Sequence, residues 1–420
     1  MVKFYPFKAL RPLSSNAAKI SSEPYDVIST AEAREAAKER PDSFLHVIRS
    51  EIDLPESVDV HSDPVYQKAA ENLEAMIRDG SLVEDEQPGL FIYRQVWQQR
   101  RQVGIVGCCD VADYDDDTIK KHEKTRPDKE DDRTRHMLEL SAHAEPVFLT
   151  FRDDPEIIAR IETDMNQRPI FHFVAPDGVT HTGWRVEDPG FYVDAMKRTE
   201  CLYIADGHHR SAGAARAAHE CAASNPDHDG SEEYNRFLAV LFPAGELNIL
   251  AYNRVVRGLD GFDRETLLQQ LGQVGDLSPT TDPTPPGPGS FCIYMGPGDG
   301  GGWHLLTLAA DSIDADDPIG SLDVSLLQDR ILAPLLGIED PRTDPRIDFV
   351  GGIRGTEELQ RRVDSGDGDL AVSMHPTSIE QLLEVSDAGK IMPPKSTWFE
   401  PKLRSGLFIH SFQPTLACKG

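Results

Sequence analysis

The sequence has few cysteines and no long apolar run. Its six cysteines in 420 residues, two of them adjacent at Cys108 and Cys109, do not make a disulfide framework, and there is no CxxC pair. This usage fits a reducing compartment, so a cytoplasmic location is expected. No stretch approaches the roughly 18 uninterrupted apolar residues that a membrane span needs. Residues 1–8 also lack the apolar core of a secretory signal.

Basic residues are scarce relative to acidic ones. The chain carries 71 acidic and 43 basic residues, a formal net charge of −28. Non-specific nucleic-acid binding requires Lys and Arg to neutralise phosphates, so this balance argues against a nucleic-acid partner for the whole surface. A highly solvated surface is the plainer interpretation of the acidic excess. Any phosphate pocket must therefore be built locally, against an unfavourable background field.

Several catalytic motifs are missing as well. The sequence has no Gly-x-x-x-x-Gly-Lys-Ser/Thr loop, no kinase-type glycine loop with its HRD and DFG partners, no HExxH and no GxSxG. These patterns mark P-loop nucleotide binding, protein kinases, zinc peptidases and serine hydrolases. None of them assigns a function here.

Strand-like and helix-like segments alternate along the chain, which predicts an α/β fold with mixed sheets. Strands are expected at 4–10, 89–95, 102–111, 146–151, 169–175, 179–186, 201–205, 237–242, 250–256, 291–294, 304–308, 347–350 and 370–374. Helices are expected at 31–39, 66–78, 155–166, 208–222, 264–272, 324–336, 356–363 and 378–386. Ser29 and Thr30 are candidate caps for the first of these helices.

A proline-rich stretch suggests how the domains are divided. The proline density of 276–290 rules out a helix or a central strand, so a linker or a long surface loop is expected there. We therefore predict an N-terminal α/β region at 1–275, a Pro/Gly-rich linker or loop at 276–290, and a C-terminal α/β region at 291–420.

The most specific local signal is the segment Ile204-Ala-Asp-Gly-His-His-Arg210. An apolar strand ends in Asp-Gly and a helix begins at once, which brings unpaired N–H groups and a partial positive charge to one point. Gly207 lets a ligand approach the backbone closely, and Arg210 can fork two hydrogen bonds to phosphate oxygens. An ordinary strand-to-helix turn capped by Asp206 explains the pattern equally well.

Three weaker candidates follow. The segment 120–126 combines a carboxylate at Glu123 with imidazole, hydroxyl and cationic groups, although a charge run is usually a solvated face; Arg133 and Arg135 beyond it could clamp an anion or lie exposed on a helix. The segment 393–397 pairs a lysine with two hydroxyls, and its prolines also fit a structural turn. The segment 23–28 places Asp26 in a turn before a helix, which turn chemistry explains adequately.

Taken together, separated motifs in one order resemble the domain-of-unknown-function family DUF1015, sometimes described as free-serine-kinase-like, over nearly the whole chain. The motifs that carry the resemblance are Phe7-Lys-Ala-Leu-Arg-Pro12, Pro24-Tyr-Asp-Val-Ile28, His122-Glu-Lys-Thr125, Asp206-Gly-His-His-Arg210 and Met392-Pro-Pro-Lys-Ser-Thr397. The Asp-Gly-His-His-Arg element is similar to the nucleotide-phosphate motif of the ParB/sulfiredoxin-like superfamily, which includes kinases of free L-serine.

The resemblance implies a ParB/sulfiredoxin-like nucleotide-binding core with an additional α/β domain. It implies a nucleotide-dependent phosphotransferase that uses ATP or ADP with Mg²⁺ and acts on a small hydroxylated metabolite, with free L-serine first among the acceptors. The expected partners are the nucleotide and the small-molecule substrate, with a homo-oligomer as a further candidate and without a membrane or nucleic acid.

This hypothesis gives each motif a role. The predicted catalytic residues are Glu123, Asp206 and His122. The predicted cofactor-binding residues are Gly207, His208, His209 and Arg210 at the turn, with Lys395, Ser396 and Thr397 returning from the C-terminal region. Mg²⁺ is assigned to Asp206 and Glu123.

Two alternatives stay open. In the first, the same pocket binds a nucleotide or metabolite for regulation and does not turn over, so Arg210 matters and Glu123 does not. In the second, the protein is a metal hydrolase. That alternative would place zinc on His122, His136, His208 and His209.

Overall fold

The computed structural model describes residues 1–259, 263–298 and 300–412. These residues form two compact units. Unit 1 comprises Met1–Leu247 and Pro401–Gly420, and unit 2 comprises Asn248–Glu400. The chain therefore leaves unit 1, builds unit 2 and returns to unit 1 for its last segment. No helix among the described residues is long and apolar enough to cross a membrane.

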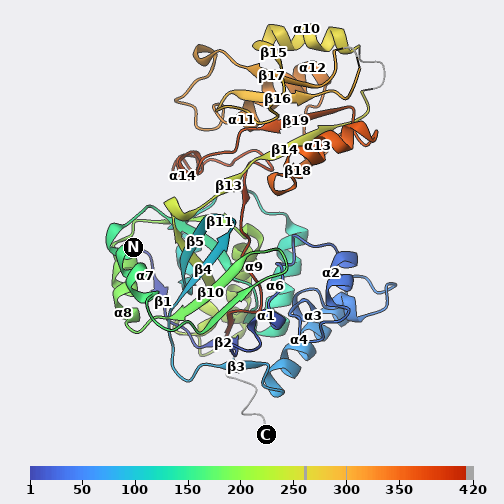
Figure 1. The fold of residues 1–420 in the computed structure, drawn as a ribbon. Coiled ribbons are helices and arrows are strands. Elements are labelled where there is room, and N and C mark those ends of the chain that lie inside the picture. The colour runs from blue at the N-terminus through green and yellow to red at the C-terminus, as the bar shows by residue number, and fades with distance from the viewer. Residues whose placement is uncertain (260–262, 299, 413–420) are drawn as a thin grey trace. The chain divides into compact units, whose positions relative to one another are not determined.

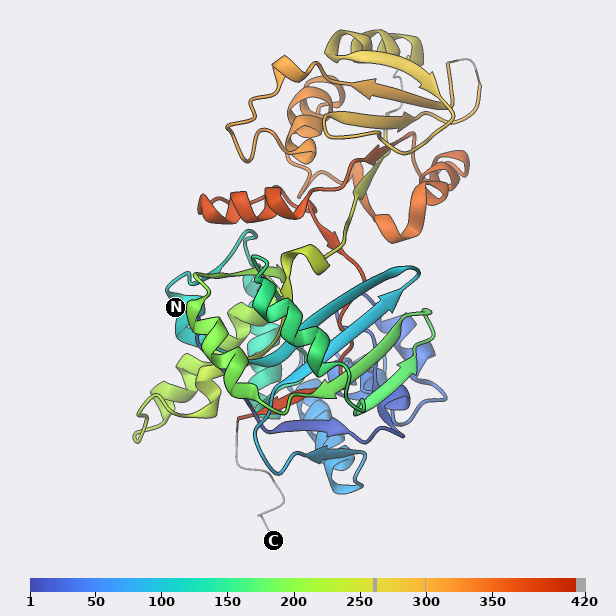
Figure 2. The same cartoon turned by 60° about the vertical axis from the view of Figure 1, so that its left-hand side comes forward.

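Unit 1 is built on a nine-stranded mixed sheet with the order β6-β11-β8-β12-β5-β4-β10-β9, and β1 pairs with β5. Its strands are β1 (Phe4–Tyr5), β4 (Phe91–Trp97), β5 (Arg100–Asp110), β6 (Ile119–Lys120), β8 (Val147–Phe151), β9 (Phe171–Val174), β10 (Thr180–Arg185), β11 (Leu202–Asp206) and β12 (Arg236–Pro243). β4 and β5 form a long antiparallel hairpin with β10 beside it, visible in Figure 2. β11 runs parallel to β6 and antiparallel to β8.

Helices complete unit 1 (Figure 1). They are α1 (Ala17–Ile20), α2 (Thr30–Ala37), α3 (Leu45–Ile48), α4 (Asp63–Arg78), α5 (Val111–Asp115), α6 (Pro127–Leu140), α7 (Pro155–Asp164), α8 (Pro189–Arg198) and α9 (His208–Ser224). Ser29 caps α2 in a capping box with Glu32, which confirms the predicted cap. A smaller sheet, β3-β2-β21-β7, joins β2 (Ala9–Pro12), β3 (Leu82–Glu84), β7 (Ala142–His143) and β21 (Ile409–Ser411).

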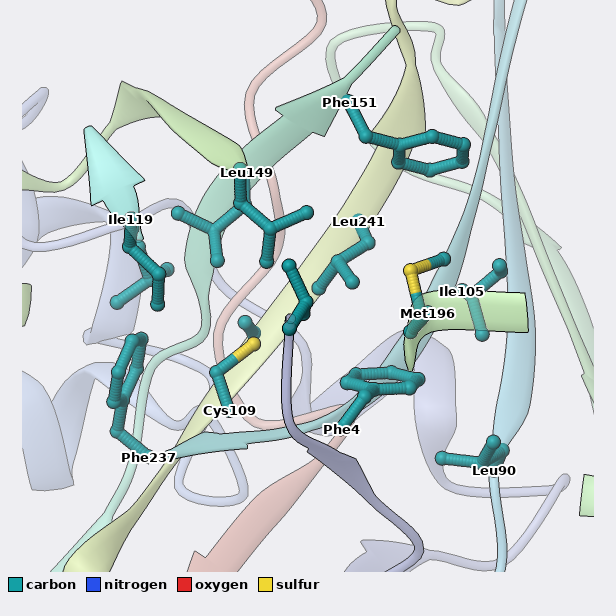
Figure 3. Packing of buried hydrophobic residues seen from close by; sticks show 14 of the residues in the cluster. Phe4, Leu90, Ile105, Cys109, Ile119, Leu149, Phe151, Met196, Phe237 and Leu241 are labelled. Atoms are coloured by element: carbon teal, nitrogen blue, oxygen red, sulfur yellow. The ribbon is translucent and has the colours of Figure 1, made fainter. Parts of the chain in front are cut away.

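Alternating side chains cover both faces of the large sheet. The odd-numbered residues of β8 (Val147, Leu149, Phe151) and of β12 (Phe237, Ala239, Leu241) enter one apolar cluster with side chains from α7, α8 and α9, part of which Figure 3 shows. On the other face, the rings of Phe148 and Phe242 pack 4.6 Å apart. The ring of Phe408, from the returning segment, packs 5.0 Å from that of Phe91. Both faces of the sheet are therefore buried against apolar side chains, which stabilises unit 1.

Unit 2 has its own six-stranded sheet, ordered β15-β17-β16-β19-β14-β18. Its strands are β14 (Tyr252–Val256), β15 (Asp276–Thr280), β16 (Ser290–Tyr294), β17 (Trp303–Thr307), β18 (Ile347–Gly351) and β19 (Leu370–Met374). A short pair joins β13 (Ile249–Leu250) to β20 (Trp398–Phe399). Its helices are α10 (Arg264–Val274), α11 (Asp323–Leu327), α12 (Ala333–Leu336), α13 (Gly355–Asp364) and α14 (Ile379–Asp387).

The observed division of the chain corrects the predicted one. Within the proposed linker, Asp276–Thr280 is an edge strand that pairs with β17, and Pro279 is tolerated because an edge strand needs only one set of backbone bonds. The stretch 276–290 therefore lies inside unit 2. The predicted boundary at 275 is wrong, and the C-terminal residues from Pro401 belong with unit 1.

Two smaller expectations also differ. The strand predicted at 4–10 is split into β1 and β2, which join different sheets. The helix predicted at 324–336 is interrupted by a π-helical turn, Gln328–Leu332, between α11 and α12. The other predicted strands and helices are confirmed within a few residues at their ends.

Candidate active site at the start of helix α9

The predicted strand–glycine–helix turn is confirmed. β11 ends at Asp206, Gly207 adopts a left-handed conformation with φ of +98°, and α9 begins at His208. No side chain caps this helix, and its first turn contains no acidic residue. The leading N–H groups of a helix have no intrahelical acceptor and carry partial positive charge. The start of α9 is therefore suited to an anion. The alternative in which Asp206 caps the helix is wrong, because Gly207 is the N-cap residue.

Asp206 lies between two cations. Its Oδ2 atom accepts a hydrogen bond from Nζ of Lys402 at 2.9 Å, and its Oδ1 atom is 3.7 Å from Nη2 of Arg210. Burial alone would raise the pKa of Asp206, but the charges of Lys402 and Arg210 hold it well below its usual value. Asp206 is therefore a carboxylate throughout the neutral range.

Arg210 is buried, with a side chain only 4% exposed. Its Nη1 group donates to the carbonyl oxygen of Pro146, and its Nε atom has no hydrogen-bond partner among the described residues. Burial acts to lower the pKa of Arg210, but nearby carboxylates, Asp26 first, leave it raised. Gly207 sits directly against this guanidinium: a Cβ on Gly207 would lie 3.0 Å from Nε. Arg210 thus supports the turn from beneath, while the sequence had suggested an open fork of donors.

The predicted segment 120–126 meets the start of α9. The rings of His122 and His208 pack edge to face with centroids 4.4 Å apart, and Nε2 of His208 accepts a long hydrogen bond, 3.5 Å, from the backbone N–H of His122. That acceptor role places the ring proton of His208 on Nδ1, which lies 3.8 Å from Oε2 of Glu123. The Glu123 side chain is 53% exposed. The structure therefore places a solvent-facing carboxylate beside an oriented imidazole.

Both imidazoles are neutral at physiological pH. Burial lowers the pKa of His122 to about 4, against a weaker opposing effect of Asp206. Burial, and then the neighbouring His122, hold the pKa of His208 well below its usual value. The Nδ1 atom of His122 is buried and has no hydrogen-bond partner in the described part of the chain. Because both rings are neutral, the positive charge around the start of α9 comes from the helix N–H groups and from Arg210 and Lys402.

His209 also connects the 120–126 loop to the start of α9. Its Nε2 atom accepts a hydrogen bond from the backbone N–H of Arg126 at 3.2 Å. Burial lowers the pKa of His209, and Asp26 opposes this shift. Both histidines of the motif therefore receive a backbone hydrogen bond from the 120–126 loop.

The turn containing Asp26, interpreted from sequence as purely structural, belongs to this neighbourhood. The backbone N–H of Tyr25 donates to Oε1 of Glu145 at 3.1 Å, and the guanidinium of Arg133 lies 3.8 Å from the centre of the Tyr25 ring. Arg133 also pairs with Asp132 at 2.7 Å and with Glu145 at 3.5 Å. Arg133 is therefore a buried cation paired with carboxylates, and the interpretation of it as an exposed helix arginine is wrong. A role in clamping an anionic substrate stays a prediction.

Arg135 conforms to the plainer of its two interpretations. Its side chain is 43% exposed, and it pairs with Asp63 and with the carbonyl oxygen of His61. Such surface pairs contribute little to stability or binding.

The zinc alternative has no supporting geometry. Among the described residues, no group of three or more His, Cys, Asp or Glu side chains is arranged to hold a metal ion. His136 is buried, and its Nε2 atom bonds to the carbonyl oxygen of Val47. This histidine therefore serves packing between α6 and α3.

Lys395, Ser396 and Thr397 lie in unit 2. The carbonyl oxygen of Lys395 accepts a hydrogen bond from Nη2 of Arg254 at 3.2 Å, and its ammonium lies 5.2 Å from the centre of the Tyr252 ring. Ser396 is buried, and its hydroxyl donates to the carbonyl oxygen of Pro393. Their role at the start of α9 stays a prediction.

Lys402 was not assigned a role from the sequence. The backbone that carries it is held by two buried glutamines: Nε2 of Gln95 donates to the carbonyl oxygen of Lys402 at 2.6 Å, and Nε2 of Gln102 donates to that of Pro401 at 3.3 Å. The available signal was the pair of glutamines, which lie opposite each other in the β4–β5 hairpin, because a buried amide needs a hydrogen-bond partner.

No curated protein matches the chain. Similar solved structures include a conserved hypothetical protein from Pyrococcus furiosus (13% identity, TM-score 0.35, covering 72% of this chain and 94% of that chain). A second is SbnI with C-terminal truncation from Staphylococcus aureus (13% identity, TM-score 0.38, covering 73% of this chain and 87% of that chain). A third is a free serine kinase in complex with AMP (13% identity, TM-score 0.33, covering 71% of this chain and 91% of that chain). Likenesses this weak do not transfer a function.

The family comparison is more decisive, because it covers most of the chain. The family described as "Protein of unknown function (DUF1015)" matches residues 4–325, a range that contains β11, the α9 turn and the loop with Glu123. The protein belongs to the DUF1015 family.

Proposed function

We propose that the protein is a nucleotide-dependent phosphotransferase that moves a phosphoryl group from ATP or ADP to the hydroxyl of a small metabolite, with free L-serine as the first acceptor to test. One observation carries the proposal: the uncapped start of α9 adjoins Glu123, whose carboxylate lies 3.8 Å from Nδ1 of His208. An anion-attracting helix end beside a proton acceptor is what phosphoryl transfer to an alcohol requires. The proposal includes a ParB/sulfiredoxin-like character for this core.

The phosphate chain of the nucleotide would lie on the backbone N–H groups of His208, His209 and Arg210. These groups and the helix dipole supply donors without adding a side-chain charge. Gly207 adopts the left-handed conformation that the turn into the helix requires, and its lack of a side chain leaves room for the Arg210 guanidinium. The buried charge of Arg210 raises the local positive potential from beneath the turn, and Lys402 adds a second cation at Asp206.

The acceptor hydroxyl would be activated by Glu123. As the hydroxyl oxygen forms its bond to phosphorus, its proton passes to the Glu123 carboxylate, and the bond from phosphorus to the leaving oxygen of the nucleotide breaks. The nucleotide departs with one phosphate fewer. His208, neutral and with Nδ1 facing Glu123, would orient the carboxylate. His122, packed on His208, keeps that ring in place.

Of the two predicted Mg²⁺ ligands, Asp206 and Glu123, only Glu123 is suited to the metal. Asp206 faces Lys402 and Arg210 already, so its negative charge is compensated by the protein. Mg²⁺ needs only one or two carboxylates when substrate phosphates and water complete its shell, and the exposed Glu123 suits that use. When bound, the metal would neutralise charge on the phosphates.

A regulatory protein that binds the nucleotide without turnover is the second candidate. The engagement of Arg210 with Pro146 and Asp206 favours it, since a guanidinium committed to the protein contributes less to charge stabilisation during transfer. The two candidates differ in whether a product forms, because both require binding at α9.

The deciding experiment incubates the full-length protein with Mg²⁺, ATP or ADP, and L-serine or other hydroxylated metabolites, and follows phosphorus NMR for a new phosphate monoester. Glu123→Gln should abolish the product while nucleotide binding, measured by calorimetry, is retained. Glu74→Gln, at an exposed position of α4, is the matched control and should behave as wild type. Nucleotide binding without any product from wild type would favour the regulatory candidate, and no nucleotide binding at all would overturn both.

A further inference from the structure

Arg254, on strand β14 of unit 2, is a buried arginine without a carboxylate partner among the described residues. It is 3% exposed. Its side chain donates to two backbone carbonyl oxygens, those of Tyr252 and Lys395, and its guanidinium lies 4.7 Å from the centre of the Phe349 ring. A guanidinium carries more N–H donors than two carbonyl oxygens use. The charge of Arg254 is therefore solvated only by dipoles and one aromatic face.

This isolation is unusual for a protein of this composition. Buried charges are costly unless an opposite charge compensates them. Acidic residues outnumber basic ones by 71 to 43, so an acidic partner is rarely lacking. Three arginines of unit 1 are comparably buried, Arg133, Arg210 and Arg404, and each faces a carboxylate. Burial lowers the pKa of Arg254 to about 9, against a weak opposing effect of Tyr252.

Lys395, one of the two residues whose carbonyl oxygen accepts from Arg254, is itself a cation and lies in a strained turn. Lys395 has a φ of +57°, a left-handed conformation that is uncommon for a residue with a side chain. The turn is held on both sides: Ser396 Oγ donates to the carbonyl oxygen of Pro393 at 2.6 Å, and Thr377 Oγ1 donates to that of Ser396 at 2.9 Å. Strain kept in place by several hydrogen bonds is typical of ligand-binding turns.

Lys395 also contributes positive charge to the same corner. Its side chain is exposed, and its ammonium lies 5.2 Å from the centre of the half-buried Tyr252 ring. Two cations thus meet at one turn, one buried and one accessible. The chain has a net charge of −28, yet these two cations have no acidic partner among the described residues. A bound anionic ligand would supply the compensating negative charge.

We propose that unit 2 contains an anion-binding site, formed by Arg254 and the turn Lys395-Ser396-Thr397, that takes the phosphate or carboxylate group of a small metabolite. Lys395 makes the first contact, and the guanidinium of Arg254 supplies paired donors to the two oxygens of the anion. Every residue of this site lies in unit 2, so the site can be tested independently of the chemistry proposed at α9.

The test is hydrogen–deuterium exchange of the full-length protein, followed by mass spectrometry, in inorganic phosphate, in acetate and in chloride at matched ionic strength. Phosphate, acetate or both should slow exchange in peptides covering 252–256 and 392–399, relative to chloride, and the stronger of the two identifies the anion. Peptides covering 202–212 report on α9 separately, so failure at one place is distinguishable from failure at the other. Unchanged exchange at 392–399 in both anions would overturn the proposal.

Variants separate binding from a purely structural role. Arg254→Met should abolish the protection by the anion while keeping or raising the melting temperature in chloride, because an apolar side chain often replaces a buried charge without loss. A melting temperature that falls equally in every salt, with protection retained, would assign Arg254 to packing alone. Arg361→Met removes an exposed arginine of α13 that pairs with Glu358, and it should leave the protection unchanged.

Lys395→Met provides an independent check if the Arg254 variant does not fold. Lys395 is exposed, so its replacement should leave folding intact. The anion concentration needed to protect peptides covering 392–399 should rise several-fold in this variant. If Lys395→Met is protected at the same anion concentration as wild type, the proposed site is contradicted.

Discussion

Nζ of Lys402 lies 2.9 Å from Oδ2 of Asp206, although the two residues are 196 positions apart in the sequence. The contact joins the returning C-terminal segment to the end of β11. Gln95 and Gln102 hold the backbone of that segment at the carbonyl oxygens of Lys402 and Pro401. The glutamines set the position of the backbone, and the ion pair fixes the carboxylate one residue before Gly207.

Replacement of Lys402 by Met should therefore destabilise unit 1. Asp206 would keep only Arg210, 3.7 Å away, as a cationic neighbour. Because the Asp206 side chain is 25% exposed and part of its charge would be solvated, the expected loss is about 1–2 kcal/mol. Urea unfolding of the wild type and of Lys402→Met measures it.

The control for this change is Lys197→Met. Lys197 pairs with Asp194 at 2.7 Å on the exposed face of α8, with both side chains more than half exposed. Exposed pairs contribute roughly 0–1 kcal/mol. Equal losses in the two variants would mean that the Lys402 contact is an ordinary surface pair.

Local signals accounted for much of the fold. The strand 201–205, the glycine and the helix 208–222 were predictable because each is encoded by adjacent residues: apolar side chains, a residue free to take positive φ, and alanines at helical density. The hairpin of β4 and β5 followed from two apolar runs with a polar turn between them. The strand at 276–280 was not predicted, because the effect of Pro279 depends on whether the strand lies at the edge of its sheet, which the sequence does not show.

The non-local part of the site was not predictable in the same way. Arg210 looks like an open phosphate fork in its own segment, but Pro146 and the carboxylates that surround it come from distant parts of the chain. Asp26 was interpreted as a turn residue for the same reason. By contrast, Glu123 was predicted to act at the same site as the Asp-Gly-His-His-Arg turn, and only the folded chain shows its carboxylate 3.8 Å from Nδ1 of His208.

Gly207→Ala should be more harmful than the same change at another glycine with positive φ. At Gly207 the added Cβ would meet Nε of Arg210 at 3.0 Å and would also be strained at φ of +98°. Gly80 has φ of +79° with nothing within 4 Å, so Gly80→Ala isolates the backbone strain of roughly 1–2 kcal/mol. The difference in unfolding free energy between the two variants measures the crowding against Arg210. No difference would mean that Arg210 moves away without cost.

Glu123→Gln should reduce turnover by about a hundred- to ten-thousand-fold, the usual contribution of a general base. The amide keeps the size and position of the carboxylate beside His208 but no longer accepts a proton. Initial rates of phosphate-monoester formation at saturating nucleotide measure the effect, with Glu74→Gln as the reference. A rate within a few-fold of wild type would remove Glu123 from the mechanism.

Acid should destabilise the protein well above the pH at which carboxylates are protonated. Burial lowers the pKa of several histidines in unit 1, to about 4 for two of them: His122, His136, His143, His181 and His208. In the unfolded chain these imidazoles titrate near pH 6.5. As the pH falls from there towards 4, the unfolded state takes up protons that the folded state does not, so the unfolding free energy falls by about 1.4 kcal/mol per pH unit for each histidine. Burial raises the pKa of Asp323 to about 6 in unit 2, and it also raises the pKa of three carboxyls of unit 1, Asp113, Glu145 and Glu246. These carboxyls work in the opposite direction, but in unit 1 they are fewer than the histidines.

Urea unfolding at several pH values in this window, followed by a probe in unit 1 such as Trp184, measures the slope. His136→Gln keeps a side-chain group able to reach the carbonyl oxygen of Val47 and should reduce the slope by the share of one histidine. His219→Gln is the control, because His219 is 61% exposed and pairs with Asp115 at the surface. If wild type and His136→Gln lose stability in parallel, His136 takes up no extra proton on unfolding in this window, and the burial of its ring does not control its charge.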